Sequence, residues 1–263
     1  MIRLIVSDMD GTLLNDEKQI DTGIYDLLPV FKEKGIRFVV ASGRQYPSLK
    51  QHFKAHIEDV VVIAENGAFV VDDGRELLVH PMNQETIRHC ISEARKIEGA
   101  EPLVCGKYHS YTSNRELYDF LSSPKFNYSM KLVDDLYQLK EGIIKVSLIE
   151  YAGNSAESCY ERLRPSLRED LHLVISGPGC LDIGLDGINK GAAVEELQRL
   201  WKITPEETMV FGDQFNDVDM MQKAYYSYAM QGASEGVRKF ARFDAGSNND
   251  GAVVKTIREM TGL

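Results

Sequence analysis

Residues 4–13 read LIVSDMDGTL, a short apolar run that leads directly into two aspartates. The run from Leu4 to Ser7 carries no charge and predicts a buried β-strand. Asp8 and Asp10 point the same way if the strand continues, because alternate residues of a strand share a face. Two carboxylates beside a core cost free energy unless a cation or hydrogen bonds compensate them. A strand that simply ends in a turn is the alternative, since Asp and Gly favour turns.

The flanking sequence alternates between strand and helix patterns. Apolar runs in IRFVVAS (36–42), DVVVIAENG (59–67) and ETMVFGD (207–213) predict further strands, and TGIYDLLPVFKEKG (22–35) has the apolar spacing of a helix. Strands that are apolar on both faces and separated by helices are typical of parallel sheets. The pattern therefore predicts an α/β fold with a doubly wound, Rossmann-like parallel sheet.

A different pattern begins near Met82, where strands outnumber helices. Runs such as AEPLVCG, GIIKVSLIEY and LHLVISG predict strands, and NQETIRHCISEARKIEG predicts an amphipathic helix. We expect an open α+β sheet with helices on one face. The α/β pattern returns later in the chain, so the predicted domains are a discontinuous α/β core at 1–82 and 186–263 and an inserted α+β domain at 83–185.

The composition is that of a globular protein with an acidic surface. Of 263 residues, 43% are hydrophobic and 27% charged, and 40 acidic against 30 basic residues give a formal net charge of −10. This charge disfavours nucleic acid and anionic membranes, so an anionic substrate needs a local positive site. No apolar run reaches the ~20 residues of a membrane helix, and the N-terminus lacks a signal-peptide pattern. We therefore expect a cytoplasmic protein, a monomer or small homo-oligomer, whose four cysteines are reduced.

Polar residues follow three predicted strands of the core, and a lysine begins a later helix. The clusters are Asp8 with Asp10, then Ser42, Gly43 and Arg44, then Asp213, Asn216 and Asp217, and the lysine is Lys190. Ligands of open α/β sheets bind beyond the carboxyl ends of the strands. We therefore expect these clusters to meet in one crevice.

The residue types in these clusters suit phosphoryl transfer. Asp8 and Asp213 offer the oxygen ligands that Mg²⁺ prefers, and Asp10 can serve as an acid or base beside Asp8. The groups that can bind phosphate oxygens are the Ser42 hydroxyl, the Gly43 amide and the Lys190 ammonium.

Each cluster also has an ordinary structural interpretation. The segment 42–44 is a common loop sequence, Lys190 alone suits a solvated side chain, and residues 212–217 suit a turn or a helix cap. A calcium loop does not fit residues 8–11, because that motif needs a flanking helix and further ligands at alternate positions. The order of the clusters and their places after strands favour a common site.

Four motifs in this order resemble those of the haloacid dehalogenase superfamily. They read DMDGTL (8–13), VVASGR (39–44), INKG around Lys190, and GDQFND (212–217). The insertion after the third strand, together with AENGA (64–68), resembles the Cof-type branch of sugar-phosphate phosphatases, which carries a mobile α+β (type IIB) cap. The resemblance covers essentially the whole chain.

The resemblance implies a role for each motif residue. By this resemblance Asp8 is the nucleophile, and Asp10 is the general acid and base, whose backbone carbonyl also binds Mg²⁺. Asp8 and Asp213 supply carboxylates to the metal, and Asp217 supports the metal or the lysine. The phosphate ligands are the Met9 amide, Ser42, Gly43, Lys190 and Asn216.

The sequence thus predicts a Mg²⁺-dependent phosphatase that acts on a small phosphorylated metabolite, such as a sugar phosphate, through an aspartyl-phosphate on Asp8. We expect Asp8, against the metal, to stay ionised, and Asp10 to need a raised pKa, so that Asp10 carries a proton near neutrality. A sugar phosphomutase on the same scaffold is one alternative, and a non-catalytic phosphosugar-binding regulator is another. No nucleic-acid or membrane partner is expected.

Overall fold

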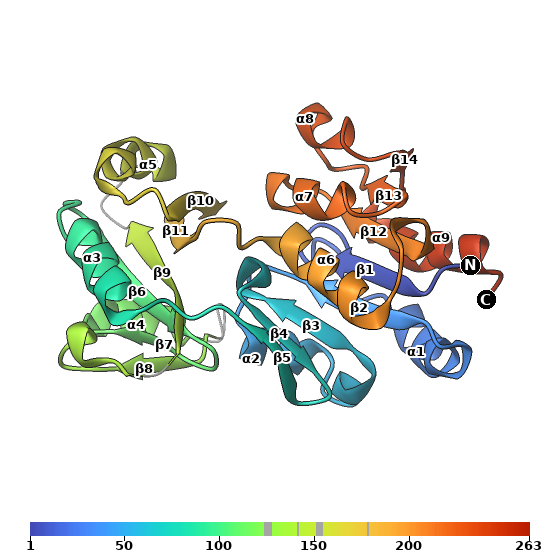
Figure 1. Ribbon diagram of the computed structural model, residues 1–263, viewed down its shortest axis with the longest axis horizontal. Helices are drawn as coiled ribbons and strands as arrows, with labels where there is room; N and C mark the ends of the chain where they lie inside the picture. Colours follow the sequence, from blue (N-terminus) through green and yellow to red (C-terminus); the bar gives the residue numbers. More distant parts are fainter. Residues whose placement is uncertain (124–127, 141, 151–154, 178) are drawn as a thin grey trace. The chain divides into compact units, whose positions relative to one another are not determined.

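The computed structural model describes residues 1–123, 128–140, 142–150, 155–177 and 179–263. The chain divides into two units (Figure 1): the first comprises Met1–Arg44, Leu49–Leu78 and Asn189–Leu263, and the second comprises Gln45–Ser48 and Val79–Ile188. The predicted domain limits, 1–82 with 186–263 and 83–185, stay a prediction, because compactness alone does not show that either part folds by itself.

The first unit is built on an eight-stranded sheet with the order β14-β13-β12-β1-β2-β3-β4-β5. From β14 to β3 neighbouring strands are parallel, whereas β4 runs antiparallel to β3. The strands are β1 (Leu4–Asp8), β2 (Arg37–Ala41), β3 (Val61–Ala64), β4 (Phe69–Asp72), β5 (Arg75–Val79), β12 (Thr208–Gly212), β13 (Tyr226–Ala229) and β14 (Phe243–Asp244). The strand order reverses between β1 and β12, and this is the switch point of a doubly wound sheet. The predicted α/β class is confirmed.

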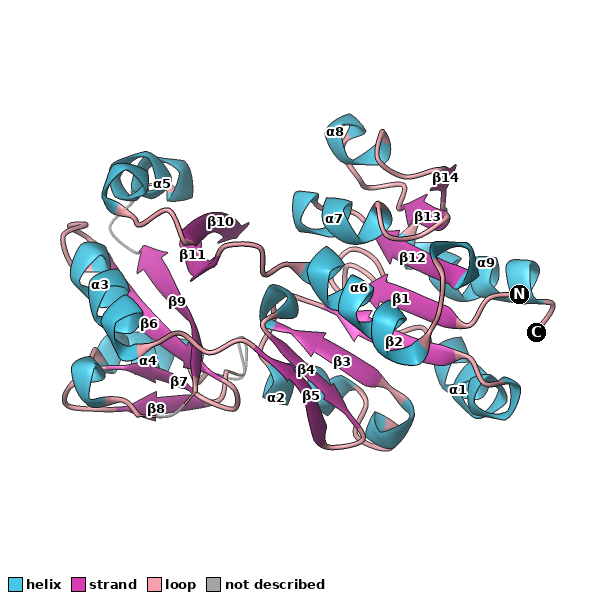
Figure 2. Cartoon of the chain, viewed as in Figure 1, coloured by secondary structure: helices cyan, strands magenta, loops and turns pink. Residues whose placement is uncertain are grey.

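Helices cover both faces of this sheet (Figure 2). They are α1 (Gly23–Lys34), α2 (Tyr46–His52), α6 (Lys190–Trp201), α7 (Val218–Met221), α8 (Glu235–Arg238) and α9 (Ala252–Thr261). Phe31 of α1 stacks on Phe38 of β2, with ring centroids 6.0 Å apart. Val39, the next residue, belongs to the cluster that includes Leu197 of α6. Because successive strand residues face opposite sides, α1 and α6 lie on opposite faces.

Two turns of the first unit use residues with positive φ. Helix α1 ends where Gly35 adopts a left-handed conformation with φ 68°, as a C-terminal glycine favours. The hairpin of β4 and β5 turns at Asp73 and Gly74, which have φ values of 48° and 71°. Positive φ at both central residues is the requirement of a type I′ turn.

The second unit contains a six-stranded sheet with the order β10-β11-β9-β6-β7-β8. Its strands are β6 (Ala100–Gly106), β7 (Ser110–Thr112), β8 (Met130–Leu132), β9 (Ile143–Glu150), β10 (Leu171–Gly177) and β11 (Cys180–Leu185), and its helices are α3 (Gln84–Ala94), α4 (Arg115–Leu121) and α5 (Ala156–Leu163). All neighbouring strands are antiparallel except β7 and β8. Tyr151, the end of one predicted strand, lies outside the described residues.

The prediction that the helices of the second sheet share one face is wrong. Val104 of β6 packs in a cluster with Ile87 of α3 and Cys159 of α5. Leu103, the preceding residue, packs in a separate cluster with Leu117 of α4. Alternate residues of a strand face opposite sides, so α4 lies on the other face from α3 and α5. Strand β6 is apolar on both sides because both of its faces are covered.

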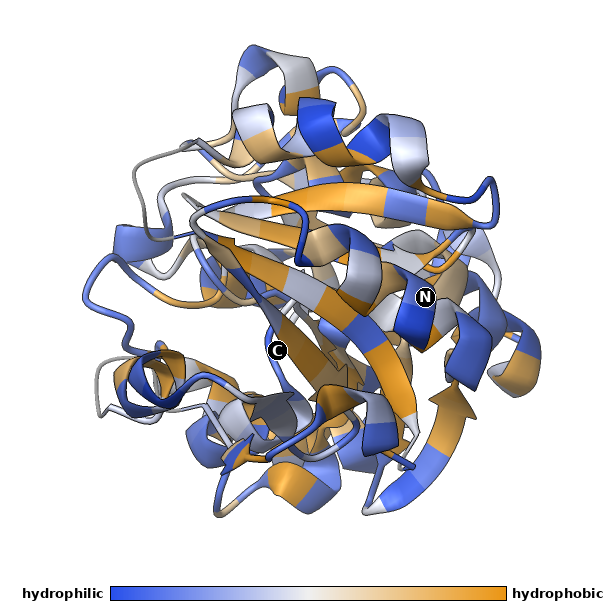
Figure 3. Cartoon of the chain, turned by 90° about the vertical axis from the view of Figure 1, so that its left-hand side faces the viewer, coloured by the Kyte–Doolittle hydropathy of each residue, from blue (hydrophilic) through white to orange (hydrophobic). Residues whose placement is uncertain are grey.

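The hydrophobic residues concentrate in the strands, as the orange ribbons of Figure 3 show. Across the described part of the chain, no helix is both long and apolar enough to cross a membrane. All four cysteines are free thiols: Cys90, Cys105 and Cys159 are buried, and Cys180 is half-buried. This agrees with the expectation of reduced cysteines.

Candidate active site

The switch point of the first sheet brings three acidic side chains together. Asp8 is the last residue of β1, and Asp213 follows the neighbouring strand β12. One carboxylate oxygen from each of Asp8, Asp213 and Asp217 can be chosen so that all lie within 4.8 Å of one another. All three residues are buried. The structure therefore joins residues that are about two hundred positions apart in the sequence, as the strand order of this fold requires.

Lys190 lies between two of these carboxylates. Its Nζ donates to Asp8 Oδ1 at 2.5 Å and to Asp217 Oδ1 at 2.7 Å, and the residue is only 1% exposed. Lys190 is the first residue of α6, which starts where the Asn189 side chain accepts a hydrogen bond from the Ala192 amide. Burial alone would lower the pKa of Lys190, but the charges of Asp217 and Asp8 outweigh burial and raise it.

The two carboxylate oxygens of Asp217 bind different partners. Its Oδ2 accepts hydrogen bonds from the backbone amides of Asp213, at 2.9 Å, and Gln214, at 3.0 Å, while Oδ1 holds Lys190. These bonds shape the short 3₁₀ helix Phe215–Asp217 that follows β12. Because every bond orients another member of the cluster, Asp217 supports the other residues and has little freedom to move.

Asp213 is oriented by two further donors. Thr12 Oγ1 donates to Asp213 Oδ1 at 3.0 Å, and Gln214 Nε2 donates to Oδ2 at 2.9 Å. The chain can approach so closely only because residue 11 is glycine. A Cβ on Gly11 would lie 2.5 Å from Asp213 Oδ2, and Gly11 has a φ of +78°, where other residues are strained.

The cluster carries more negative than positive charge. Three carboxylates face one ammonium, which leaves two negative charges uncompensated if all groups are ionised. Burial, helped by the charges of Asp217 and Asp213, raises the pKa of Asp8 to about 8 against the attraction of Lys190. Burial also raises the pKa of Asp213. Lys190 alone does not offset this desolvation, and the expectation that Asp8 stays ionised beside the metal remains a prediction for the metal-bound protein.

Asp10 lies in the opposite electrostatic environment. Arg44 donates through Nε to Asp10 Oδ2 at 2.6 Å and through Nη2 to Oδ1 at 2.5 Å, and Lys18 Nζ donates to Oδ1 at 2.9 Å. Burial would raise the pKa of Asp10, but the hydrogen bonds and charges of Arg44 and Lys18 together lower it. The expectation of a raised pKa is wrong in this state, because two cations hold the carboxylate ionised.

The predicted phosphate ligands occupy the loops that follow β1, β2 and β12. Ala41 is the register partner of Asp8, so Ser42 and Gly43 follow β2 beside the start of the Met9 loop. Met9 is fully buried, and Ser42 is 2% exposed and accepts a hydrogen bond from the Arg44 amide.

Asn216, in the loop after β12, donates from Nδ2 to Asn66 Oδ1 at 3.0 Å. Asn66 follows β3, so this bond links loops at the ends of two different strands. The structure thus places every predicted phosphate ligand at the carboxyl ends of strands or at the start of α6.

Several residues of this site were not assigned from the sequence. Thr12 lies inside the first motif and Gln214 inside the last, so their positions suggested that they belong to the site but did not indicate their roles. Arg44 completes the second motif, where only its two preceding residues were assigned. Lys18 had no signal, because an exposed lysine in a loop is ordinary and only the fold brings it to Asp10.

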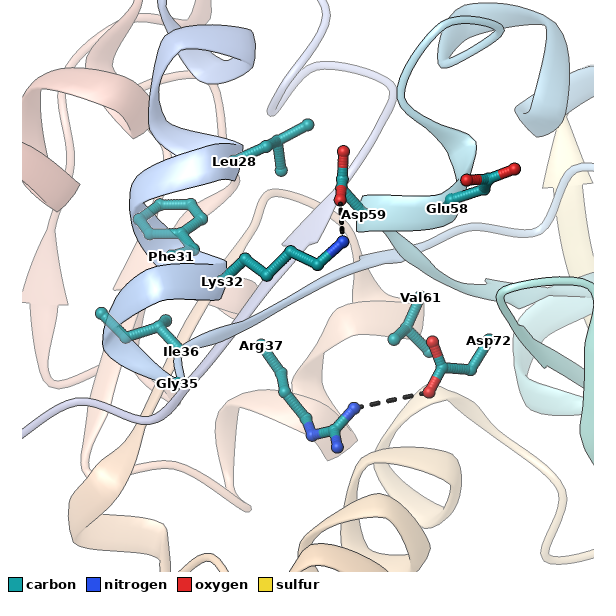
Figure 4. Close-up of a pocket in the computed structure, with 10 residues that line it drawn as sticks. All are labelled: Leu28, Phe31, Lys32, Gly35, Ile36, Arg37, Glu58, Asp59, Val61 and Asp72. Atoms are coloured by element: carbon teal, nitrogen blue, oxygen red, sulfur yellow. Dashed lines mark hydrogen bonds and ion pairs between the residues drawn. The ribbon is translucent and has the colours of Figure 1, made fainter.

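A hollow of about 250 Å³ elsewhere in the first unit has the wrong chemistry for this role. Figure 4 draws its ten lining residues, which include Arg37 and Val61 at the first positions of β2 and β3. The hollow therefore lies at the opposite ends of these strands from Ser42. Its cations are already paired, Lys32 with Asp59 at 3.1 Å and Arg37 with Asp72 at 3.4 Å.

Comparisons with known proteins agree with this geometry. Residues 5–257 match the family model described as haloacid dehalogenase-like hydrolase. A 5-amino-6-(5-phospho-D-ribitylamino)uracil phosphatase of Escherichia coli (strain K12) is 30% identical over 264 residues, covering 97% of this chain and 95% of that protein. A Streptococcus mutans structure matches with TM-score 0.88 and 28% identity over 100% of both chains. A Thermotoga maritima structure matches with TM-score 0.86 and 26% identity over 98% of this chain and 97% of that one.

Proposed function

The chain belongs to the haloacid dehalogenase-like hydrolase family, and from that premise we propose that it is a Mg²⁺-dependent phosphatase that forms an aspartyl-phosphate on Asp8. Family membership, predicted from four motifs, is confirmed, and so is the predicted enzyme class of phosphoric monoester hydrolase. The observation that carries the finer proposal is the buried group of Asp8, Asp213 and Asp217 around Lys190, at the switch point of the sheet.

The residues of this group fit a hard divalent cation. The uncompensated negative charge of the cluster and the raised pKa of Asp8 are expected of carboxylates that bind a metal ion. We propose that Asp8 and Asp213 hold Mg²⁺ through their carboxylates, with the Asp10 backbone carbonyl as a further oxygen ligand. When bound, the ion would supply positive charge to the phosphoryl oxygens and reduce their repulsion of the nucleophile.

The protein residues then divide the reaction into two displacements. Lys190 holds Asp8 Oδ1, and we propose that Oδ2 attacks phosphorus, which breaks the bond to the leaving alkoxide. Water next attacks the aspartyl-phosphate and releases phosphate and the Asp8 carboxylate. Covalent catalysis replaces one difficult step by two easier ones, and positioning by Ser42 and Lys190 contributes most of the rest.

Asp10 would move the proton in both steps. As a base toward the attacking water, Asp10 must be ionised, which its lowered pKa favours. As an acid toward the leaving group, it must first take up a proton, which the hydrogen bonds from Arg44 and Lys18 oppose. We propose that substrate binding displaces Lys18 from Asp10. The Lys18 side chain is exposed, so its ammonium group can return to water when the ion pair breaks.

We propose a small phosphorylated metabolite as the substrate, in the class of sugar phosphates and related esters. The Escherichia coli relative is named for 5-amino-6-(5-phospho-D-ribitylamino)uracil, so this phosphorylated ribityl compound is the first candidate to test. Hexose phosphates, pyridoxal phosphate and flavin phosphates extend the panel. We propose that the residues that determine substrate specificity lie in the inserted segment 83–185.

The test measures phosphate release from this panel with and without Mg²⁺, with Asp8→Asn as the blank. Release that needs both Mg²⁺ and Asp8 supports the proposal, and release by Asp8→Asn at the wild-type rate rules out the covalent route. Conversion of a hexose phosphate to its isomer in the presence of a bisphosphate activator, with little phosphate release, would favour a phosphomutase. Binding of esters without turnover would favour a non-catalytic regulator.

A further inference from the structure

The loop after β3 contains three successive residues with left-handed backbone conformations. Glu65, Asn66 and Gly67 have φ values of 51°, 54° and 102°, and they form the short 3₁₀ helix η2 (Glu65–Gly67). Residues other than glycine rarely adopt positive φ, and consecutive ones are rarer still. Strain of this kind is retained where surrounding contacts enforce it, and such places are often functional.

The backbone of η2 is bonded to the loop after β2. The Asn66 amide donates to the Ser42 carbonyl at 3.0 Å, and the Glu65 amide donates to the Arg44 carbonyl at 3.0 Å. A Cβ on Gly43 would lie 3.1 Å from both the Oδ1 and the Nδ2 of Asn66. The Asn66 side chain therefore packs directly against the glycine whose amide is a predicted phosphate ligand.

The same side chain also reaches the loop after β12. Asn66 Oδ1 accepts the 3.0 Å hydrogen bond from Asn216 Nδ2. Gly67 completes the set of contacts, because a Cβ there would lie 2.3 Å from the Asn189 carbonyl oxygen and 3.4 Å from the Lys190 amide. Turn η2 thus touches three of the four segments that carry predicted phosphate ligands: the loops after β2 and β12 and the start of α6.

We infer that Asn66 is a positioning residue of the phosphate site: its amide fixes the side chain of Asn216 against the Gly43 loop, while the left-handed turn seats the start of α6. The inference rests on the proposed phosphatase function. Asn66 is suited to both parts, because asparagine tolerates left-handed φ better than most residues and carries a hydrogen-bond acceptor. Its contribution should appear in phosphate affinity more than in the stability of the fold.

The test compares Asn66→Gly, Asn216→Ala and the double variant. Glycine accepts the left-handed backbone, so Asn66→Gly removes the amide without adding strain. We expect this variant to weaken the binding of inorganic phosphate, and to raise KM for p-nitrophenyl phosphate, by about 3- to 10-fold, the effect of losing one ordering hydrogen bond. The melting temperature should stay close to that of the wild type.

The double variant separates positioning from general damage. If Asn66 acts through Asn216, the double variant binds phosphate no more weakly than Asn216→Ala alone, because coupled residues give non-additive effects. Asp73→Gly is the matched control, since Asp73 is also non-glycine with φ 48° but lies in the turn between β4 and β5. It should leave phosphate binding and kinetics unchanged.

Calorimetric titration of inorganic phosphate in the presence of Mg²⁺ decides the inference independently of turnover. Three results would overturn it: an Asn66→Gly variant that binds phosphate as tightly as the wild type, a double variant whose loss of phosphate affinity is the product of the two single losses, or a wild-type protein that binds no phosphate. A wild-type protein that binds phosphate but hydrolyses no ester would refute the proposed phosphatase function, and the binding constants would still judge the role of Asn66.

Discussion

Lys190→Met removes the ammonium from the centre of the acidic cluster while keeping most of the side-chain volume. Lys190 is 1% exposed, and its partners Asp8 and Asp217 are 6% and 0% exposed. Solvent therefore screens these ion pairs little, and breaking a buried pair costs about 3–5 kcal/mol of unfolding free energy. We expect Lys190→Met to lose stability in this range when no metal is present.

The unfolding free energy lost in Lys190→Met should increase with pH. Lys190 opposes the rise in the pKa of Asp8, so its removal raises that pKa further. An acid whose pKa is raised in the folded state loses its stabilising contribution as pH rises through that pKa. In the wild type Asp8 ionises near about pH 8, whereas in Lys190→Met it stays protonated to higher pH, so the destabilisation should be larger near about pH 9 than near about pH 7. Mg²⁺ should restore part of the loss, because it neutralises the remaining carboxylates.

Urea unfolding in a chelator, and again with Mg²⁺, measures these differences. Lys145→Met is the matched control, because Lys145 pairs with Asp182 at 2.9 Å and both side chains are at most 10% exposed. That variant should also be destabilised, but Mg²⁺ should not rescue it, since its pair is not part of the cluster. A Lys190→Met loss below about 1 kcal/mol at both pH values, or equal Mg²⁺ rescue of the two variants, would refute the reasoning.

Three further predictions concern the same site. Arg44→Met removes two hydrogen bonds from Asp10 and should move the limb of the pH–rate profile that reports Asp10 to higher pH. Lys18→Met should cause a smaller shift, because the Lys18 side chain is 58% exposed. An unchanged limb in Arg44→Met would contradict this prediction. Gly11→Ala should weaken Mg²⁺ binding by at least ~10-fold in a titration, because the added Cβ would displace the Asp213 side chain. Gly74→Ala is the control: Gly74 also has a positive φ, +71°, but a Cβ there meets open space, so the variant should lose only about 1–2 kcal/mol of stability. Mg²⁺ affinity should rise with pH up to about 8, as the metal displaces a proton from Asp8, and a pH-independent affinity would show that Asp8 is already ionised.

The fold was predictable because its signals are local and periodic. Unbroken apolar strands such as β1 and β3, separated by helices such as α1, allow little but a doubly wound sheet. The face covered by α4 was predicted wrongly, because alternation along β6 shows two apolar sides without saying which helix covers each. Strand β14 and helix α8 have two and four residues, too few for a periodic signal.

The positions of Asp8 and Asp10 at the end of β1 were predictable from the sequence, but their protonation was not. Asp8 and Asp10 are two positions apart in the sequence, yet burial raises the pKa of one and two cations lower that of the other. Such differences depend on partners distant in the sequence: Arg44 lies 34 positions from Asp10, and Lys190 lies 182 from Asp8. Sequence can place a carboxylate at a strand end, but its pKa follows from the neighbours that folding supplies.

The central claim is that Asp8 becomes covalently phosphorylated during turnover. The most direct measurement is to quench the enzyme in acid while it hydrolyses a phosphate ester with Mg²⁺, and to locate the phosphoryl group by peptide mass spectrometry. The account predicts one phosphoryl group on Asp8, and none in Asp8→Asn. A protein that turns over without any phosphorylated peptide, or that carries the group on another residue, would contradict it.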